Sequence, residues 1–485
     1  MFAAAVAVAS LPFSAASLTV ARIRREVGRA RRCRARDEKF QDLGLLRGRS
    51  RSCRFFAARA PWYGRRVPLA SFVVEGYRSF VRRTSVELRP LTLLFGYNSA
   101  GKSALVRALP LLSASCGGGN VGPLALDAEA MRKPTYADIA TRISSRNKLA
   151  FGLTWDDDDQ PVRTLEIALR AEDKGHLVSE LFARGADGAE LLHLIDVPGE
   201  QGKYEIAVPG KSSLTVTLPF KDLRPTLSGT TSSIPKDIRA RLGQCAVRLE
   251  SLQESVHWLG AVRAAPERRW AYGGEPARLG GTGAEAPAKL AYDARGRRLI
   301  LPNVSAMLRT MFNQGIEVRD SGEEFALEME PVEGAPLRIS IVDVGEGVGQ
   351  VLPVLVLGAM AAAGDLPPGA LLAIEQPEMH LHPRAERALA EFFGKIVNAP
   401  SRPRLLIETH SENLLLFVQL LVARGDLKPE DVSILWLETL ANGESDCRAI
   451  ALDPRGRPKG WPAGVFSEDV ETARELFLAQ RSARP

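Results

Sequence analysis

Long hydrophobic runs are missing from this sequence of 485 residues. No apolar stretch reaches the roughly 18 residues that a membrane-spanning helix needs, so we expect no membrane segment. No heptad pattern persists, which argues against long coiled-coil arms, and no internal repeat is visible. With 45% hydrophobic residues, the chain can still bury a large core, as one domain with an inserted lobe or as two domains.

Cysteine is scarce, with five in the whole chain. Two lie near the N-terminus, and the other three, Cys116, Cys245 and Cys447, are far apart. This odd number, without any zinc-ligand spacing, indicates neither a disulfide framework nor a structural zinc site. We therefore expect a protein of the reducing cytoplasm.

The core has no excess of positive charge, although the chain as a whole has a net charge of +7 and a pI of about 9.2. Residues 1–66 alone carry a net charge of +12, which leaves −5 for residues 67–485. The basic pI is therefore a property of this leader. It gives no indication that the core binds nucleic acid.

The leader, residues 1–66, is rich in arginine and poor in acid. It has three interpretations: translated upstream sequence from a misplaced start, a targeting segment, or a basic arm that binds nucleic acid. A secretory signal does not fit, because no positive charge precedes its apolar stretch. The strand pattern begins abruptly at Val67, so we favour the misplaced start and leave the leader out of the fold.

From Val67 the pattern predicts an α/β protein. Residues 67–147 and 256–452 alternate strands and helices, typical of a parallel or mixed core sheet covered on both faces. Short β-like runs and turns predict an antiparallel β-rich lobe inserted at 148–235, and 453–485 form a C-terminal tail. We expect a helix over 236–258. The acidic stretch WDDDDQ at 155–160 is interpreted as a hairpin tip in preference to a metal site.

The most specific motif is GYNSAGKS, Gly96 to Ser103, which matches the phosphate-binding pattern G-x-x-x-x-G-K-[ST]. A predicted strand precedes it and a predicted helix follows. The two glycines let the backbone N–H groups converge on an anion, to which the helix adds its positive end. Lys102 is expected to reach the β- and γ-phosphates, and Ser103 to place its hydroxyl on Mg²⁺. The remaining phosphate-binding candidates of the loop are Asn98, Ser99, Ala100 and Gly101.

Two further strand ends carry candidate catalytic residues. In LLAIEQPE the apolar run ends at Glu375, an acid that can hold the water shell of Mg²⁺ beside a phosphate loop. In LLIETH the run ends at Glu408, followed by His410, which can contact a γ-phosphate or a water. A solvent-exposed strand-end acid and a structural histidine are the plainer alternatives. For His380 and His382 a metal site is disfavoured, because no third ligand is evident.

A glycine-rich segment, Asp343 to Gln350, opens a long apolar helix and makes a second anion site possible at Gly345 and Gly347. Because the chain already has its phosphate loop, such a site would serve the nucleotide of a partner subunit. The alternative is a turn that merely begins a helix. The arginines Arg263, Arg268 and Arg269 could contact phosphate or nucleic acid, but we favour surface ion pairs.

Taken in order, GYNSAGKS, DVGEGVGQ, LLAIEQPEMHLHP and LLIETHSE resemble the ABC-type ATPases of the SMC/RecF/OLD group. The resemblance implies a P-loop NTPase fold, a Walker A loop at Gly96–Ser103, a Walker B acid at Glu375 and a switch histidine at His410. Asp343–Gln350 would be a degenerate signature motif. The ending of the chain is similar to that of a prokaryotic subfamily of such ATPases with an uncharacterised C-terminal domain.

The resemblance also bears on hydrolysis. Many relatives carry a second acid after the Walker B acid, where this sequence has Gln376. An amide orients water but cannot accept its proton; Glu378 or Glu408 would have to supply the carboxylate. We therefore expect slow turnover of ATP. The resemblance also implies a homodimer that binds ATP with Mg²⁺. The alternative is a scaffold that senses ATP, hydrolyses it poorly and recruits a separate effector protein or nucleic acid.

The resemblance further implies a role in prokaryotic DNA maintenance or anti-phage defence. Only 75 residues follow His410, so we expect no fused nuclease. Any effector, a nuclease or a toxin, would be a separate protein, and DNA remains a possible partner.

Overall fold

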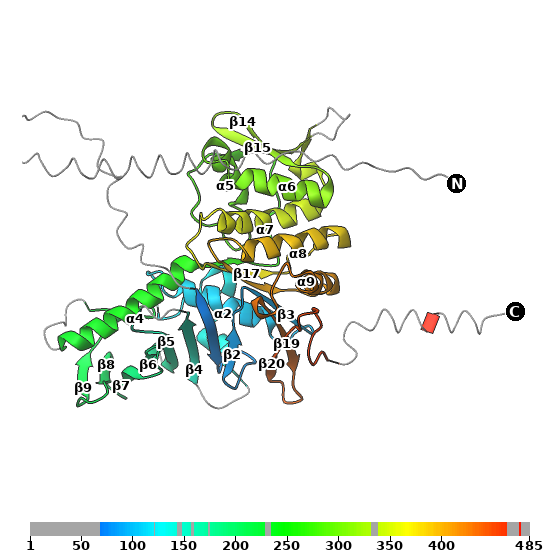
Figure 1. Ribbon diagram of the computed structural model, residues 1–485. Coiled ribbons are helices and arrows are strands. Elements are labelled where there is room, and N and C mark those ends of the chain that lie inside the picture. Colours follow the sequence, from blue (N-terminus) through cyan, green and yellow to red (C-terminus); the bar gives the residue numbers. More distant parts are fainter. Residues whose placement is uncertain are drawn as a thin grey trace, which may run out of the picture. The chain divides into compact units, whose positions relative to one another are not determined.

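The computed structural model describes residues 68–120, 122–142, 148–156, 160–172, 175–227, 234–330, 338–462 and 475–476. All of them fall within the unit Gly64–Pro485, whose helices and strands are labelled in Figure 1. Among the helices that these residues form, none combines the length and the apolar character needed to cross a membrane. The predicted leader 1–66 lies outside the described residues, as does most of the predicted tail beyond residue 462.

A six-stranded sheet forms the centre of the protein. Its order is β12-β17-β18-β3-β19-β20, with β20 antiparallel to β19 and the other neighbours parallel. The strands are β3 (Leu91–Gly96), β12 (Val256–Leu259), β17 (Leu371–Glu375), β18 (Arg404–Glu408), β19 (Val432–Thr439) and β20 (Ser445–Ile450). Because β3, β17 and β18 are parallel, their carboxyl ends meet at one edge of the sheet, where all three predicted motifs lie.

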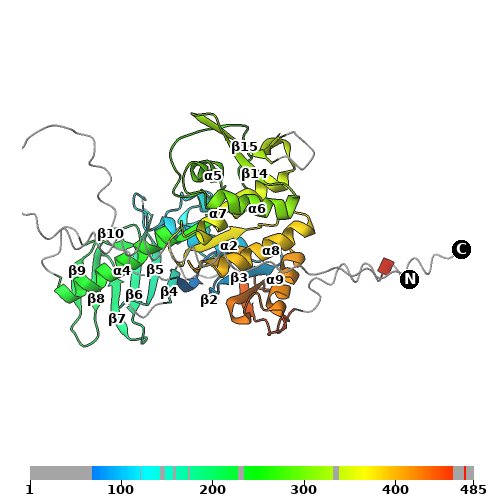
Figure 2. The same ribbon diagram turned by 45° about the horizontal axis from the view of Figure 1, so that its top comes forward.

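Both faces of this sheet are buried, as the continuous apolar runs predict. On one face Leu93, Ile374 and Ile407 pack into a core with the helices; each such fully buried side chain contributes about 1.5–3 kcal/mol. The helices of this layer (Figure 2) are α5 (Ala286–Arg295), α6 (Ile300–Phe312), α7 (Glu346–Ala362), α8 (Pro383–Val397) and α9 (Glu412–Arg424). The opposite face, with Leu94, packs on α2 (Lys102–Ala114).

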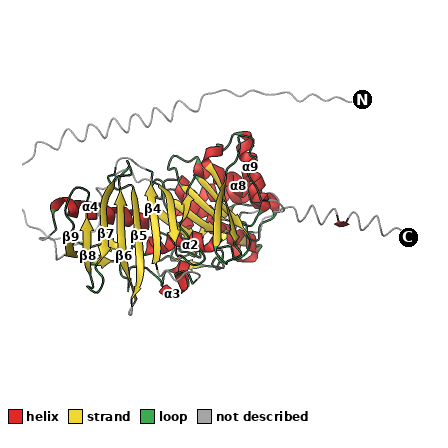
Figure 3. Ribbon diagram, turned by 90° about the horizontal axis from the view of Figure 1, so that it is seen from below, coloured by secondary structure: helices red, strands yellow, loops and turns green. Residues whose placement is uncertain are grey.

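An eight-stranded antiparallel sheet lies beyond α2, in the order β2-β1-β4-β5-β6-β7-β8-β9 (Figure 3). Its inner face shares a core with α2 and with α4 (Lys236–Ser255). The strands are β1 (Leu69–Glu75), β2 (Thr84–Glu87), β4 (Lys148–Trp155), β5 (Thr164–Glu172), β6 (Gly175–Arg184), β7 (Glu190–Asp196), β8 (Lys203–Ala207) and β9 (Leu214–Thr217).

The antiparallel sheet extends beyond the segment 148–235 that the sequence predicts as an insertion. Strands β1 and β2, at the start of the predicted core, form its first two members, since β1 pairs with both β2 and β4. The insertion therefore lengthens a sheet that the core itself begins. Strand β7, with the sequence ELLHLID, lies within the predicted β-rich lobe.

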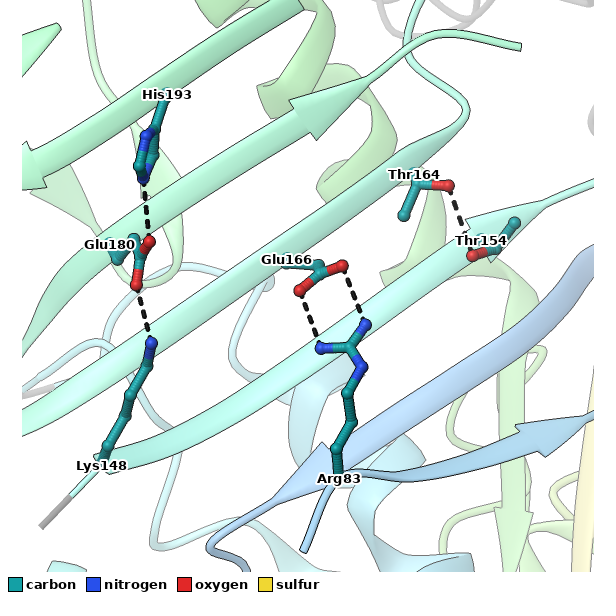
Figure 4. A network of polar contacts seen from close by, with 7 residues as sticks. All are labelled: Arg83, Lys148, Thr154, Thr164, Glu166, Glu180 and His193. Carbon is teal, nitrogen blue, oxygen red and sulfur yellow. Dashed lines mark hydrogen bonds and ion pairs between the residues drawn. The ribbon is translucent and has the colours of Figure 1, made fainter. Parts of the chain in front are cut away.

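The other face of this sheet carries cross-strand polar pairs (Figure 4). Such partly exposed pairs contribute little to stability individually, but they fit the alternation of buried and exposed residues that fixes strand register. The pairs are Arg83 with Glu166, Lys148 and His193 with Glu180, and Thr154 with Thr164.

Shorter elements complete the unit. Near the helical layer, a small sheet has the order β13-β15-β14, and β16 pairs with β15. The bounds are β10 (Phe220–Lys221), β11 (Arg224–Pro225), β13 (Trp270–Ala271), β14 (Ile316–Asp320), β15 (Glu324–Met329), β16 (Ile339–Ser340), α3 (Tyr136–Ile139), and the 3₁₀ helices η1 (Glu129–Met131), η2 (Ile341–Asp343) and η3 (Pro429–Asp431).

The predicted fold class is confirmed: the chain has an α/β, P-loop NTPase fold with a parallel core sheet.

The predicted helix over 236–258 is wrong at its end. It stops at Ser255, and Val256–Leu259 form β12 against β17, because Val256 and Trp258 are residue types that favour a strand. Of the acidic stretch 155–160, residues 157–159 lie outside the described part, and Asp156 pairs with Arg404.

Candidate functional site

The loop Gly96–Ser103 joins β3 to α2, as its spacing predicts. Glycine is required at two of its positions. Gly96 has φ +147°, and a Cβ there would lie 2.1 Å from the carbonyl oxygen of Leu437. Gly101 has φ +95°, and its Cβ would lie 2.8 Å from Ser445 Oγ. The backbone therefore makes a tight curl at the positive end of α2, an arrangement that suits an anion.

The Lys102 side chain lies within this curl. Its Nζ donates hydrogen bonds to the carbonyl oxygens of Gly96 at 2.8 Å and Tyr97 at 2.7 Å. The residue is only 4% exposed, and burial lowers the pKa of its ammonium group. The ammonium group therefore has two carbonyl partners here. Phosphate oxygens, which carry more negative charge, can take the place of these carbonyls.

Ser103, the first-turn hydroxyl of α2, contacts the end of β18. Its Oγ donates to Glu408 Oε1 at 2.7 Å. Glu408 is 3% exposed, and its other oxygen, Oε2, has no hydrogen-bond partner among the described residues. Burial, with the nearby Glu375 carboxylate, raises the pKa of Glu408 to about 7, against the lowering effect of the Ser103 hydrogen bond.

Glu375, the predicted Walker B acid, ends β17 directly beside Glu408 in the strand register. It is 1% exposed. Both of its oxygens accept from Arg107 of α2, Oε1 from Nε at 2.7 Å and Oε2 from Nη2 at 2.6 Å. Trp258 Nε1 of β12 also donates to Oε1, at 3.0 Å. This two-bonded pair raises the pKa of the Arg107 guanidinium.

The residues after Glu375 tie its strand end to that of β18. Gln376 has φ +44°, and its backbone N–H donates to the Glu408 carbonyl at 2.7 Å. Glu378 Oε1 accepts from the backbone N–H of His410 at 2.9 Å, and its Oε2 has no partner among the described residues. Burial raises the pKa of Glu378. Two predicted catalytic residues, Glu378 and His410, therefore hold each other's loops in place.

The His410 side chain is exposed at the same edge of the sheet. Burial of part of the ring and the positive charge of Lys102 lower its pKa. This lowered pKa favours the neutral form of the imidazole. In that form it can both donate and accept a hydrogen bond.

The structure thus gathers Lys102, Ser103, Glu375, Glu408 and His410 at one sheet edge. The glycine-rich segment Asp343–Gln350 lies close to the loop after β17 and begins α7. A Cβ on Gly347 would meet the carbonyl oxygen of His380 at 2.6 Å, whereas one on Gly345 would meet nothing within 4 Å. Between this segment and the phosphate loop, no hydrogen bond or ion pair links described residues.

The secondary candidates take structural roles. Arg268 pairs with Asp343 at 2.7 Å, and Arg269 lies 3.6 Å from Glu324, which matches the interpretation as surface ion pairs. Arg263 departs from it. This residue is 4% exposed, and its guanidinium donates to the carbonyl of Glu375 at 2.7 Å and of Gln376 at 3.3 Å. Burial lowers its pKa to about 10.

The two histidines of the β17–α8 loop have separate contacts. His382 caps α8 by accepting from the backbone N–H of Arg384, and His380 Nε2 lies 3.7 Å from Glu346. Among the described residues, no group of three His, Cys, Asp or Glu residues could hold a metal ion.

The sequence prediction missed Arg107 and Trp258, the two partners of Glu375. One signal for Arg107 was available: it lies four residues after Ser103, and residues four apart share a helix face. Trp258 had no signal, because the predicted helix included it. Glu408 was recognised only as a possible replacement base, yet it is the carboxylate that contacts Ser103.

Residues 315–416 match the sequence profile of a family described as "AAA domain, putative AbiEii toxin, Type IV TA system". The matched range contains the glycine-rich segment, the ends of β17 and β18, and His410. Over this range the chain is similar to that AAA family. The resemblance to ABC/AAA-type ATPases that the motifs indicate is therefore confirmed. The phosphate loop precedes this AAA segment in sequence and joins it in space, through Ser103 and Glu408.

No curated protein matches the sequence. Among solved structures, an SMC head domain from Thermotoga maritima is 11% identical, with a TM-score of 0.37, and covers 79% of this chain and 98% of its own. A Pyrococcus furiosus Smc head domain with an extended coiled coil, bound to the C-terminal domain of ScpA, is also 11% identical, with a TM-score of 0.41, and covers 85% and 99%. An Smc head bound to the C-terminal winged-helix domain of ScpA reaches a TM-score of 0.44 at 11% identity, and covers 79% and 98%.

Proposed function

We propose that the chain binds ATP with Mg²⁺ at Gly96–Ser103 and hydrolyses it slowly. One observation carries the proposal: the phosphate-loop hydroxyl of Ser103 contacts a buried carboxylate, Glu408, from a strand end more than 300 positions away. Such convergence of a glycine loop, a lysine, a hydroxyl and strand-end acids at one sheet edge suits a nucleoside triphosphate.

The residues of the site fit a triphosphate and its metal. The loop backbone at Gly96 and Gly101 has no room for side chains and leaves N–H groups for phosphate oxygens. Lys102 exchanges its two carbonyl partners for β- and γ-phosphate oxygens. Ser103 and a strand-end carboxylate would hold the Mg²⁺ ion and its waters. Bound Mg²⁺ supplies charge neutralisation between the β- and γ-phosphates.

Slow turnover follows from the residues near the attacking water. Gln376, at the position of the usual second acid, orients a water without taking its proton. Glu378, one of the two carboxylates that could replace it, already accepts from the His410 backbone. His410 remains able to contact the γ-phosphate. Because phosphoryl transfer depends mostly on positioning and charge, the missing base slows hydrolysis without preventing it.

We further propose an ATP-gated homodimer. Gly345 and Glu346, at the start of α7, are exposed, and the N–H groups of this helix end suit the phosphates of a nucleotide bound to a second copy. ATP would close the pair by contacting the phosphate loop of one copy and the segment Asp343–Gln350 of the other. Sedimentation of the protein with and without ATP tests this: a dimer that forms only with ATP is expected.

The proposed activity is tested by measuring ATP binding and phosphate release for wild type and Lys102→Ala. We expect wild type to bind ATP and release phosphate slowly, and the variant to lose both. If wild type binds ATP yet releases phosphate no faster than the variant, the second candidate holds: a scaffold that senses ATP and recruits an effector. Gln376 in place of a base favours that alternative.

The biological setting is proposed at a coarser level. The family description names a toxin and a toxin–antitoxin system, which supports a role in prokaryotic anti-phage defence or DNA maintenance, with a separate nuclease or toxin, or DNA, as partner. The free cysteines Cys116, Cys245 and Cys447 suit a reducing cytoplasm. Co-expression with neighbouring gene products tests the partner: an effector retained by wild type with ATP, and lost with Lys102→Ala, is expected.

A further inference from the structure

Two buried glutamates end adjacent strands beside the phosphate loop, and their partners differ. Glu375 accepts three hydrogen bonds, two from Arg107 and one from Trp258. Glu408 accepts one, from Ser103, and keeps Oε2 without a partner among the described residues. The acid that the motif assigns to the metal is thus the one whose oxygens are already bound.

Glu375 cannot turn toward Ser103 without giving up Arg107. The pair is largely buried, with side-chain exposures of 15% for Arg107 and 1% for Glu375. Parting it would leave a guanidinium without its counter-charge beside the apolar core, which is strongly unfavourable. The ring of Trp258 adds to the constraint, because its Nε1 would lose an acceptor and the Arg107 guanidinium lies 5.9 Å from the ring centroid.

Trp258 is itself held in place from behind. A Cβ on Gly281 would lie 2.1 Å from the indole ring, so the backbone of this loop packs directly on it. Glu129 accepts from the N–H groups of Gly281 and Thr282 and fixes the loop. The position of Glu375 is therefore determined by Arg107 on one side and by a braced indole on the other.

Glu408 meets the requirements that Glu375 does not. Its Oε1 already lies 2.7 Å from the Ser103 hydroxyl, the group that the phosphate-binding pattern places on Mg²⁺. Its second oxygen is available for a metal-bound water. Magnesium usually keeps several of its waters and is held through one or two carboxylates, so a single carboxylate beside the serine is sufficient.

From this difference we infer that Glu408 is the carboxylate that holds the water shell of Mg²⁺ at Ser103, and that Glu375 is a positioning residue that fixes α2 through Arg107. The inference rests on the proposed ATP site and names the carboxylate that would hold Mg²⁺ there. It reverses the roles that the motif alone gives to the two acids.

The test is the affinity for ATP measured by calorimetry, once in excess Mg²⁺ and once in EDTA, for wild type, Glu408→Gln and Glu375→Gln. Wild type is expected to bind more tightly with Mg²⁺. Glu408→Gln should lose about tenfold or more of that gain, taken as the ratio of its own affinities in Mg²⁺ and in EDTA. Glu375→Gln should keep the gain. A Glu408→Gln protein that keeps the full gain, or a Glu375→Gln protein that loses it, overturns the inference.

A second variant guards against a folding defect, because Glu375→Gln weakens the pair with Arg107. The double variant Arg107→Gln with Glu375→Gln places two amides opposite each other and should also keep the Mg²⁺ gain; its loss overturns the inference. The affinity in EDTA reports whether each variant still forms the loop.

If wild type fails to bind ATP in either condition, the proposed function itself is wrong. If wild type binds and gains from Mg²⁺ but Glu408→Gln gains equally, only the present inference fails.

Discussion

Arg107 and Glu375 form a two-bonded ion pair although they lie 268 positions apart in the chain. The pair joins the helix after the phosphate loop to the strand end of the AAA segment. Glu375 is only 1% exposed, so water has little access to it. The phosphate loop and the AAA segment are therefore held together by charge as well as by apolar packing.

Replacing Arg107 by alanine should destabilise the protein by about 3–5 kcal/mol, because it leaves a buried carboxylate without its counter-charge. The measurement is the midpoint of urea unfolding. The matched control is Arg268→Ala, which removes an exposed two-bonded pair with Asp343. Solvent screening makes that pair weak, so its loss should shift the midpoint far less. Equal shifts for the two variants would contradict the structural role of the Arg107 pair.

Gly345 and Gly347 offer a second comparison within one segment. A Cβ on Gly347 would lie 2.6 Å from the His380 carbonyl oxygen, whereas Gly345 has open space and φ −59°. Gly347→Ala should therefore destabilise by about 1–3 kcal/mol, although alanine normally favours a helix. Gly345→Ala should leave the thermal midpoint unchanged or slightly raised. A Gly347→Ala protein as stable as wild type would show that this segment does not pack on the loop after β17.

The strands that carry motifs could be predicted because their apolar runs are continuous and end at a glycine or a glutamate of a motif. LLAIE and RLLIE form β17 and β18 as expected, and the phosphate loop follows β3. Local pattern was sufficient there because a strand buried on both faces needs nothing but apolar side chains. The segment VHWL was misassigned for a related reason. Three apolar residues and a histidine after a helix do not reveal whether they continue it or pair with a distant strand.

The partners within the site could not be predicted in the same way. The contact between Ser103 and Glu408, like that between Arg107 and Glu375, depends on the order of strands, which places β18 between β17 and β3. A motif identifies each acid but not which basic or hydroxyl group faces it. The choice between two neighbouring glutamates therefore became visible only when the register set them side by side.

The buried His257 should make stability depend on pH. Burial, with the charge of Arg278, lowers its pKa to about 4, and its Nε2 has no hydrogen-bond partner among the described residues. The unfolded chain takes up a proton near pH 6.5. Because the folded-state pKa is depressed, this contribution to stability is complete above about pH 6.5 and is lost progressively as the pH falls toward 4.

The expected loss at about pH 5 is roughly 2 kcal/mol. The test compares urea unfolding of wild type and His257→Asn at about pH 7.5 and pH 5. Asparagine does not titrate and retains an N–H donor for the backbone carbonyl of Glu254, the hydrogen bond that raises the pKa of His257 against its burial. The variant should lose less stability than wild type over this interval. An identical loss in the two proteins would show that His257 does not titrate in this range.

Changing Gln376 to glutamate should accelerate hydrolysis. The new carboxylate can accept the proton of the attacking water, a contribution of about 10²–10⁴ in rate for general bases. The Gln376 backbone N–H, which donates to the Glu408 carbonyl, is unaffected by the exchange. Single-turnover phosphate release measures the effect, with ATP affinity as the control for an intact site. Gln376→Glu with Lys102→Ala should release no phosphate above background. If Gln376→Glu binds ATP as wild type does and is no faster, the side chain of residue 376 does not face the attacking water, and the explanation for slow turnover is wrong.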